Sequence, residues 1–225
     1  MSWKIAALLA FGAGAAAALT ASATTLVPAM PPWSEAPTVA DMAAAYPARA
    51  KAENISGHVE LTCEIGPNDR PRDCSTVIEK PGNYGFGAAA RKLAEQMKVG
   101  QSGSYYHQNV FIPVTFDKAV LAGAPTVTKP AWASMPTAQD FQATFPKTEN
   151  GVNDVRVVLG CTVGHDGALG GCAVNEEDPA GQGYGAGALA LAAKFKVGPW
   201  SMDGEPTVGA RINLPIRYEL TPVKQ

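Results

Sequence analysis

Apolar and polar side chains alternate along residues 58–65, which is the pattern of a half-buried β-strand. The apolar face consists of Val59, Leu61, Cys63 and Ile65. Residues 66–69, Gly-Pro-Asn-Asp, have turn chemistry, and residues 72–79 return along the first strand. The pattern therefore predicts an antiparallel hairpin in which Cys63 lies opposite Cys74.

Helical signals flank this hairpin. Thr38 can cap a short helix over residues 38–45, which must end at the Tyr-Pro pair that follows, because a residue before proline disfavours helix. Apolar residues spaced four apart indicate the inner face of a second helix over residues 88–99. Residues 109–116 form a last strand, so the predicted order is helix, strand, strand, helix, strand.

The same pattern occurs twice. Residues 155–198 repeat residues 57–100 in one register, each residue lying 98 positions after its partner. The identical pairs include Val59/Val157, Leu61/Leu159, Cys63/Cys161, Cys74/Cys172, Gly85/Gly183 and Leu93/Leu191. The repeat predicts a second set of elements: a helix over 137–144, a hairpin over 156–176, a helix over 186–197 and a strand over 211–220. Function must be sought in a module used twice.

The repeat sets the domain boundaries. The first module covers residues 33–120 and the second covers residues 132–225, with linkers at residues 24–32 and 121–131. Helices combined with an antiparallel hairpin predict an α+β fold, with a small antiparallel sheet in each module and its helices on one side.

The two copies share one tryptophan and differ in another. Trp33 and Trp132 recur before each first helix, where we expect them to close one end of each core rather than to stack on a ligand. Trp200 has no counterpart in the first copy. Because the copies differ most between the second helix and the last strand, partner-specific contacts are expected there.

Residues 1–23 have the pattern of a secretory signal: a lysine, an apolar stretch and a small-residue cleavage site, Ala21-Ser22-Ala23. The alternative is an uncleaved membrane anchor over residues 5–27, which carry no charge. A net charge of −2 and the absence of a basic run argue against nucleic acid as a partner. We therefore expect an exported, periplasmic protein, or an inner-membrane protein that faces the periplasm if the anchor is retained.

The chain has four cysteines in two equally spaced pairs. In an exported protein this arrangement predicts two disulfides, Cys63–Cys74 and Cys161–Cys172. Metal binding is the rival interpretation, but zinc sites use closer cysteine pairs with histidines, and the three histidines do not recur between the copies. No metal and no cofactor is expected.

Proline interrupts both last strands, at Pro113 and Pro215. Proline cannot donate to a strand ladder and is confined to edge strands or bulges, so each last strand is predicted to be a sheet edge. An edge can accept an extended segment of a partner, or the proline can serve to block such pairing; the sequence leaves both open. The candidate partner-binding residues on these edges are Val110, Ile112, Val114, Phe116, Ile212, Leu214, Ile216 and Tyr218.

An ordered set of short motifs resembles the C-terminal domain of TonB-family energy transducers. The first copy contributes Tyr46-Pro47, the Gly57-to-Cys63 strand, Gly85-Phe86-Gly87 and Ile112-Pro113-Val114; the second contributes Phe145-Pro146, Cys161-Thr162-Val163, Gly183-Tyr184-Gly185 and Leu214-Pro215-Ile216. The resemblance implies a noncatalytic periplasmic domain that pairs its last strand with a short segment of an outer-membrane receptor. A membrane-anchored transducer of outer-membrane transport is the alternative, and it requires residues 5–27 to be retained.

Catalytic motifs are weak in this chain. No nucleophile elbow is present, and Gly82, Gly85 and Gly87 lack the context of a phosphate loop. Glu79 and Glu177 recur at a strand end, which indicates a solvated edge rather than a general acid. A periplasmic hydrolase would need a pocket that joins the two copies, for example through His107 and Glu177. The chain is therefore predicted not to be an enzyme.

Overall fold

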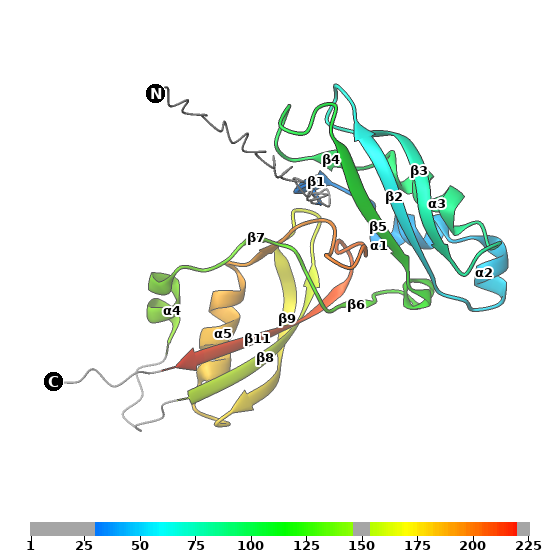
Figure 1. Ribbon diagram of the computed structural model, residues 1–225. Helices are drawn as coiled ribbons and strands as arrows, with labels where there is room; N and C mark the ends of the chain where they lie inside the picture. Colours follow the sequence, from blue (N-terminus) through cyan, green and yellow to red (C-terminus); the bar gives the residue numbers. More distant parts are fainter. Residues whose placement is uncertain (1–29, 146–153, 220–225) are drawn as a thin grey trace, which may run out of the picture.

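The computed structural model describes residues 30–145 and 154–219. Two small sheets, one in each half of the chain, carry most of the ordered structure (Figure 1). The predicted signal segment and the alternative anchor lie outside the described residues. The fold is α+β, as predicted.

The first half is built on a three-stranded antiparallel sheet in the order β3-β2-β5. Its strands are β2 (Gly57–Ile65), β3 (Pro71–Lys80) and β5 (Asn109–Phe116). Two short helices, α1 (Val39–Ala45) and α2 (Ala48–Ala52), precede the sheet, and α3 (Phe86–Ala94) packs against β3 and β2. The order of elements follows the prediction, with α2 as an unpredicted addition.

The second half repeats this arrangement with one extra strand. Its sheet has the order β6-β11-β8-β9. The strands β8 (Asp154–Val163), β9 (Leu169–Asp178) and β11 (Arg211–Glu219) are antiparallel neighbours, and β6 (Thr126–Val127) runs parallel to β11. The helices are α4 (Ala138–Thr144) and α5 (Tyr184–Ala192). Part of the predicted linker therefore belongs to the sheet.

Two short strand pairs extend the modules: β1 (Trp33–Glu35) with β4 (Lys98–Val99), and β7 (Trp132–Ser134) with β10 (Lys196–Val197). A 3-10 helix, η1 (Lys118–Ala122), leads out of β5. The prediction of helices over 88–99 and 186–197 was wrong at both ends. Each helix starts two residues earlier, at a buried aromatic residue, and stops early because the chain after it is needed as a strand.

Local signals explain where the helices begin. Thr38 accepts a hydrogen bond from the Asp41 N–H while the Asp41 carboxylate accepts one from the Thr38 N–H, and Thr137 and Asp140 repeat this capping box at α4. Gly85 and Gly183 precede α3 and α5 with positive φ angles of 86° and 85°, which glycine adopts without steric cost.

Each sheet buries one face. Val59, Leu61 and Ile112 are fully buried in the first core, and Val157 and Leu159 are their counterparts in the second. Both predicted disulfides are present, Cys63–Cys74 and Cys161–Cys172, and join the two strands of each hairpin. The first core also contains Trp200 and Ala210, which come from the second half of the chain. The two halves are therefore packed together, not merely linked.

Candidate functional site

The candidate site is the outer edge of each last strand. β5 lies at the edge of its sheet, as its proline predicted. For β11 the prediction was right only in part, because β6 lies outside it over Arg211 and Ile212. The Arg211 N–H donates to the Pro125 carbonyl at 2.7 Å, so the linker closes the start of this strand.

The eight candidate partner-binding residues are core residues. Each of their side chains is at most 5% exposed, which leaves no surface for a partner to contact. Along a strand, the N–H groups of successive residues point to opposite sides. The Thr115 N–H points outward, so the N–H groups of the four candidate residues in β5 point inward to β2. The residues that face outward are the alternate ones: Phe111, Pro113 and Thr115 in β5, and Asn213, Pro215 and Arg217 in β11.

A segment of the second half closes the edge of β5. The Trp200 indole Nε1 donates to the Pro113 carbonyl at 3.0 Å, and the Thr115 N–H donates to the Gly204 carbonyl at 2.7 Å. The Thr115 hydroxyl donates to the Asp203 carbonyl at 2.7 Å. We call residues 200–204 the latch. In Figure 1 the orange chain before β11 reaches β5.

The fit of the latch depends on Gly204. This residue has a φ of 81°, and a Cβ atom placed on it would lie 2.4 Å from the Pro113 carbonyl oxygen. Trp200 is 1% exposed, and a 3.0 Å hydrogen bond joins the Val39 N–H to the Val208 carbonyl nearby. Trp200 is unique to the second copy, and any partner-specific contacts were expected in its region; the structure places it inside the first half of the same chain.

The edge of β11 has no such cover. Past Ile212, the described residues supply no strand and no hydrogen-bonded loop to its outer side. Beside it lies a hollow of about 300 Å³, lined among others by Trp132, Phe195 and Pro215. Arg211 and Arg217 are exposed on the strand, and no ion pair joins either to a described acidic residue.

The two repeated tryptophans differ in exposure, as the covered edge of β5 differs from the uncovered edge of β11. Trp33 is 8% exposed and belongs to the first core, whereas Trp132 is 36% exposed and contacts Phe195 with ring centroids 5.2 Å apart. Trp33, Trp132 and Trp200 together line a second hollow, of about 250 Å³, between the halves. The expectation that both close a core holds for Trp33 and only partly for Trp132.

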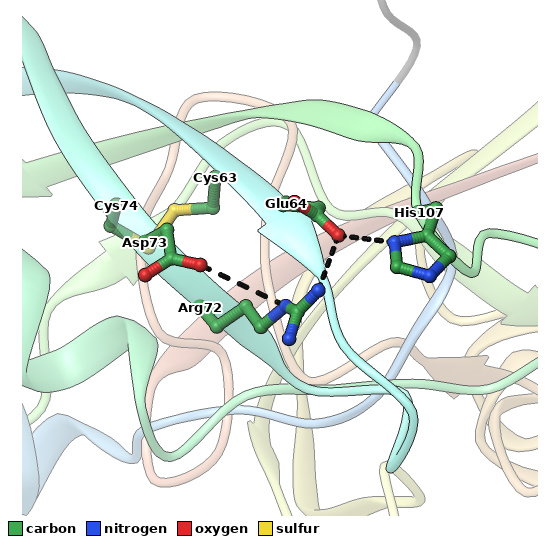
Figure 2. Close-up of polar contacts among 6 residues, drawn as sticks. All are labelled: Cys63, Glu64, Arg72, Asp73, Cys74 and His107. Carbon is green, nitrogen blue, oxygen red and sulfur yellow. Dashed lines mark hydrogen bonds and ion pairs between the residues drawn. A yellow bond between two sulfur atoms is a disulfide. The ribbon is translucent and has the colours of Figure 1, made fainter.

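A charged cluster ties the loop before β5 to the first hairpin. Figure 2 shows the Glu64 carboxylate between Arg72 and His107, with hydrogen bonds of 2.6 Å to the guanidinium and 2.5 Å to the imidazole Nδ1. Arg72, and then His107, hold the pKa of Glu64 below its ordinary value. The cluster lies beside the Cys63–Cys74 disulfide and orients the chain that enters β5.

The repeated glutamates have a structural role that sequence reasoning missed. The Glu177 carboxylate accepts a hydrogen bond of 2.9 Å from the Tyr184 N–H at the start of α5, where a negative charge is favourable. Glu79 has the same position beside α3 and is half-buried. His107 contacts Glu64 in the first half and Glu177 contacts Tyr184 in the second, so the structure does not join them in the pocket that a hydrolase would need.

Within residues 30–145 and 154–219, no group of three or more histidine, cysteine or acidic residues is arranged to hold a metal ion. No helix in the same ranges is long and apolar enough to cross a membrane.

Two comparisons with known proteins find similarity to parts of the chain, and the family match lies in its first half. The family described as Gram-negative bacterial TonB protein C-terminal matches residues 42–117, from α1 to the end of β5. An uncharacterized protein of Caulobacter vibrioides is 33% identical over 63 residues. That alignment covers 28% of this chain and 63% of the relative, which is less than two thirds of its length. The first half is thus similar to a TonB C-terminal domain. The match does not extend into the second half, where α4, β8, β9, α5 and β11 follow the order of α1, β2, β3, α3 and β5.

Proposed function

We propose that this protein is a noncatalytic protein-interaction unit of the Gram-negative cell envelope. It binds a segment of an envelope or outer-membrane protein along a sheet edge, and it does so on the periplasmic side of the inner membrane. The similarity of residues 42–117 to the TonB C-terminal domain supports an envelope role. Two disulfides support an oxidising compartment, since such bonds are rare in the cytosol.

One observation carries the proposal: the outer edge of β11 is unpaired beyond Ile212 in the described part of the chain. An unpaired edge presents a row of main-chain donors and acceptors to which another chain can add. The strand is also held rigidly, because β8 pairs with it along its whole length and a disulfide joins β8 to β9. A rigid edge reduces the ordering entropy that binding costs.

The test is photo-crosslinking in intact Gram-negative cells. A photoreactive amino acid replaces the exposed Asn213 on β11, and the control carries it at Leu189, which is exposed on α5. The proposal predicts a covalent adduct with an envelope protein at Asn213 that is absent at Leu189. Equal labelling at both positions, or no adduct at Asn213, would contradict it.

A further inference from the structure

The two halves of the chain present equivalent edges in different states. Ile112-Pro113-Val114 of β5 corresponds in the repeat to Leu214-Pro215-Ile216 of β11, so Pro113 matches Pro215 and Thr115 matches Arg217. At β5 the Pro113 carbonyl and the Thr115 N–H are bonded to the latch. No described residue occupies the corresponding groups of Pro215 and Arg217.

The latch shows what this kind of edge accepts. It is a turn rather than a strand: the Ser201 N–H donates to the Glu205 carbonyl at 2.9 Å, and Trp200 bridges to Pro206. It offers the edge one indole donor and, about four residues later, one carbonyl acceptor. It also follows the direction of β5, since Trp200 contacts Pro113 and Gly204 contacts Thr115.

From this internal example, and building on the proposed function, we propose that the open edge of β11 binds a segment of another protein in which an aromatic residue is followed, about three to five residues later, by an acidic residue. The edge of β5 takes no partner, because the latch already occupies it. The protein thus has one partner site, in its second half, although the module is present twice.

The aromatic residue is assigned from the hollow beside β11. Trp132, Phe195 and Pro215 line it, and its volume of about 300 Å³ is enough for a large side chain. The same region of the first half contains Trp200 next to the buried Trp33. An aromatic side chain that entered the hollow would cover Trp132, which is 36% exposed. In the first half, Trp33 and Trp200 are both buried in one core.

The acidic residue is assigned from charge. Arg217 lies directly opposite Arg156 on β8, and Arg156 already pairs with Glu176 at 2.6 Å. Arg217 and Arg211 have no described acidic partner and lie on the same exposed face of the strand. Arg217 lies beside the open part of the edge and Arg211 lies at its closed start, and two uncompensated arginines on this face favour a segment that carries negative charge.

The experiment uses the full protein and a synthetic probe. The probe is a fluorescent cyclic peptide that carries residues 199–206 of this chain, because this segment contains the tryptophan of the latch and two acidic residues, Asp203 and Glu205, three and five positions after it. Fluorescence anisotropy measures its affinity. Two control peptides carry either alanine for the tryptophan or amides for both acidic residues.

The expected result is saturable binding with a defined pattern. Replacing the peptide tryptophan, or Trp132→Ala in the protein, weakens binding about thirtyfold, as loss of a central aromatic contact does. Arg217→Gln weakens it about twofold to fivefold and reduces its salt dependence, whereas Arg217→Pro, which also removes the outward N–H, abolishes it. Far-UV circular dichroism and melting curves establish that each variant is folded.

Four results would overturn the inference. They are no saturable binding, equal affinity of all three peptides, a peptide-induced shift of the Thr115 amide resonance without one at Arg217, or a dimer of the protein that the peptide dissociates. The last would assign the edge to a second copy. These results are separable from failure of the proposed function. A crosslink at Asn213 without peptide binding means a partner of other chemistry, whereas absence of both removes the edge as a binding site.

Discussion

Replacing Trp200 by alanine should loosen the first half of the protein, although Trp200 belongs to the second. The indole is 1% exposed in the first core, and its Nε1 donates to the Pro113 carbonyl. The variant Trp200→Ala removes both the buried ring and the donor. It therefore tests whether the two halves form one cooperative structure.

The magnitude follows from burial. A buried tryptophan withdraws about 200 Å² from water, which at about 25 cal/mol per Å² corresponds to roughly 5 kcal/mol as an upper figure. Tryptophan-to-alanine changes in cores cost about 3–5 kcal/mol. The Pro113 carbonyl, left without its donor, accounts for about 1 kcal/mol of that. Since small domains have about 5–15 kcal/mol of stability in total, the change should be large.

The assay is urea unfolding followed by far-UV circular dichroism, with amide exchange at Thr115 as a local probe. The matched control is Trp132→Ala, which removes a side chain that is 36% exposed and should cost about 1–2 kcal/mol. We expect Trp200→Ala to lower the unfolding free energy by about 3–5 kcal/mol and to accelerate exchange at Thr115. A loss below about 1 kcal/mol, or a loss no larger than that of the control, would refute the reasoning that Trp200 is a core residue of the first half.

Three further predictions concern the latch and the hairpins. Gly204→Ala should release the latch, because its Cβ would lie 2.4 Å from the Pro113 oxygen. It should lower the melting temperature more than Gly171→Ala, since Gly171 also has a positive φ, of 56°, but has open space around it. Equal shifts of the melting temperature would argue against a tight contact. Burial, and then Asp117 and Asp203, raise the pKa of Glu205, so ionisation of this carboxyl opposes folding. Glu205→Gln should therefore stabilise the protein at pH 7 but not below about pH 4, where the glutamate is protonated in both the folded and the unfolded state. Destabilisation of the variant at pH 7 would contradict this sign. Replacing Cys161 and Cys172 by alanine should lower the unfolding free energy by about 3 kcal/mol in the chain-entropy model, and urea titration of the variant against the oxidised parent measures it; a change below about 1 kcal/mol would contradict the model.

The sequence predicted the parts that depend on local rules. The alternation over residues 58–65 was enough to predict β2, and the repeat carried that prediction to β8. Thr38 was correct as a helix cap, Thr137 caps α4 in the same way, and the cysteine spacing was enough for both disulfides. In each case the determining contacts are made by neighbours in the chain or across one short turn.

The parts that were missed depend on contacts between distant segments. The ends of α3 and α5 shifted because Val99 and Val197 are needed in strands that pair with β1 and β7. β6 forms only because the linker runs along β11. Hydrophobic periodicity reports the structure of one segment at a time and does not show which distant segments pair.

The candidate site shows the same limit. Pro113 correctly indicated an edge strand and Pro215 did so in part, since β6 lies outside the start of β11. The apolar residues chosen as contacts are buried, because an amphipathic edge strand turns its apolar face to its own core. Trp200 was recognised as unusual from the repeat alone. That it closes the equivalent edge in the same chain required the packing of one half on the other.

The central claim is that the edge of β5 is closed within the chain while the edge of β11 is open. Hydrogen exchange measured by NMR at two equivalent amides, Thr115 and Arg217, tests it most directly in the isolated protein. The account predicts slow exchange at Thr115, whose N–H donates to the Gly204 carbonyl, and fast exchange at Arg217, which has no acceptor among the described residues. Strong protection at Arg217, or none at Thr115, would contradict it.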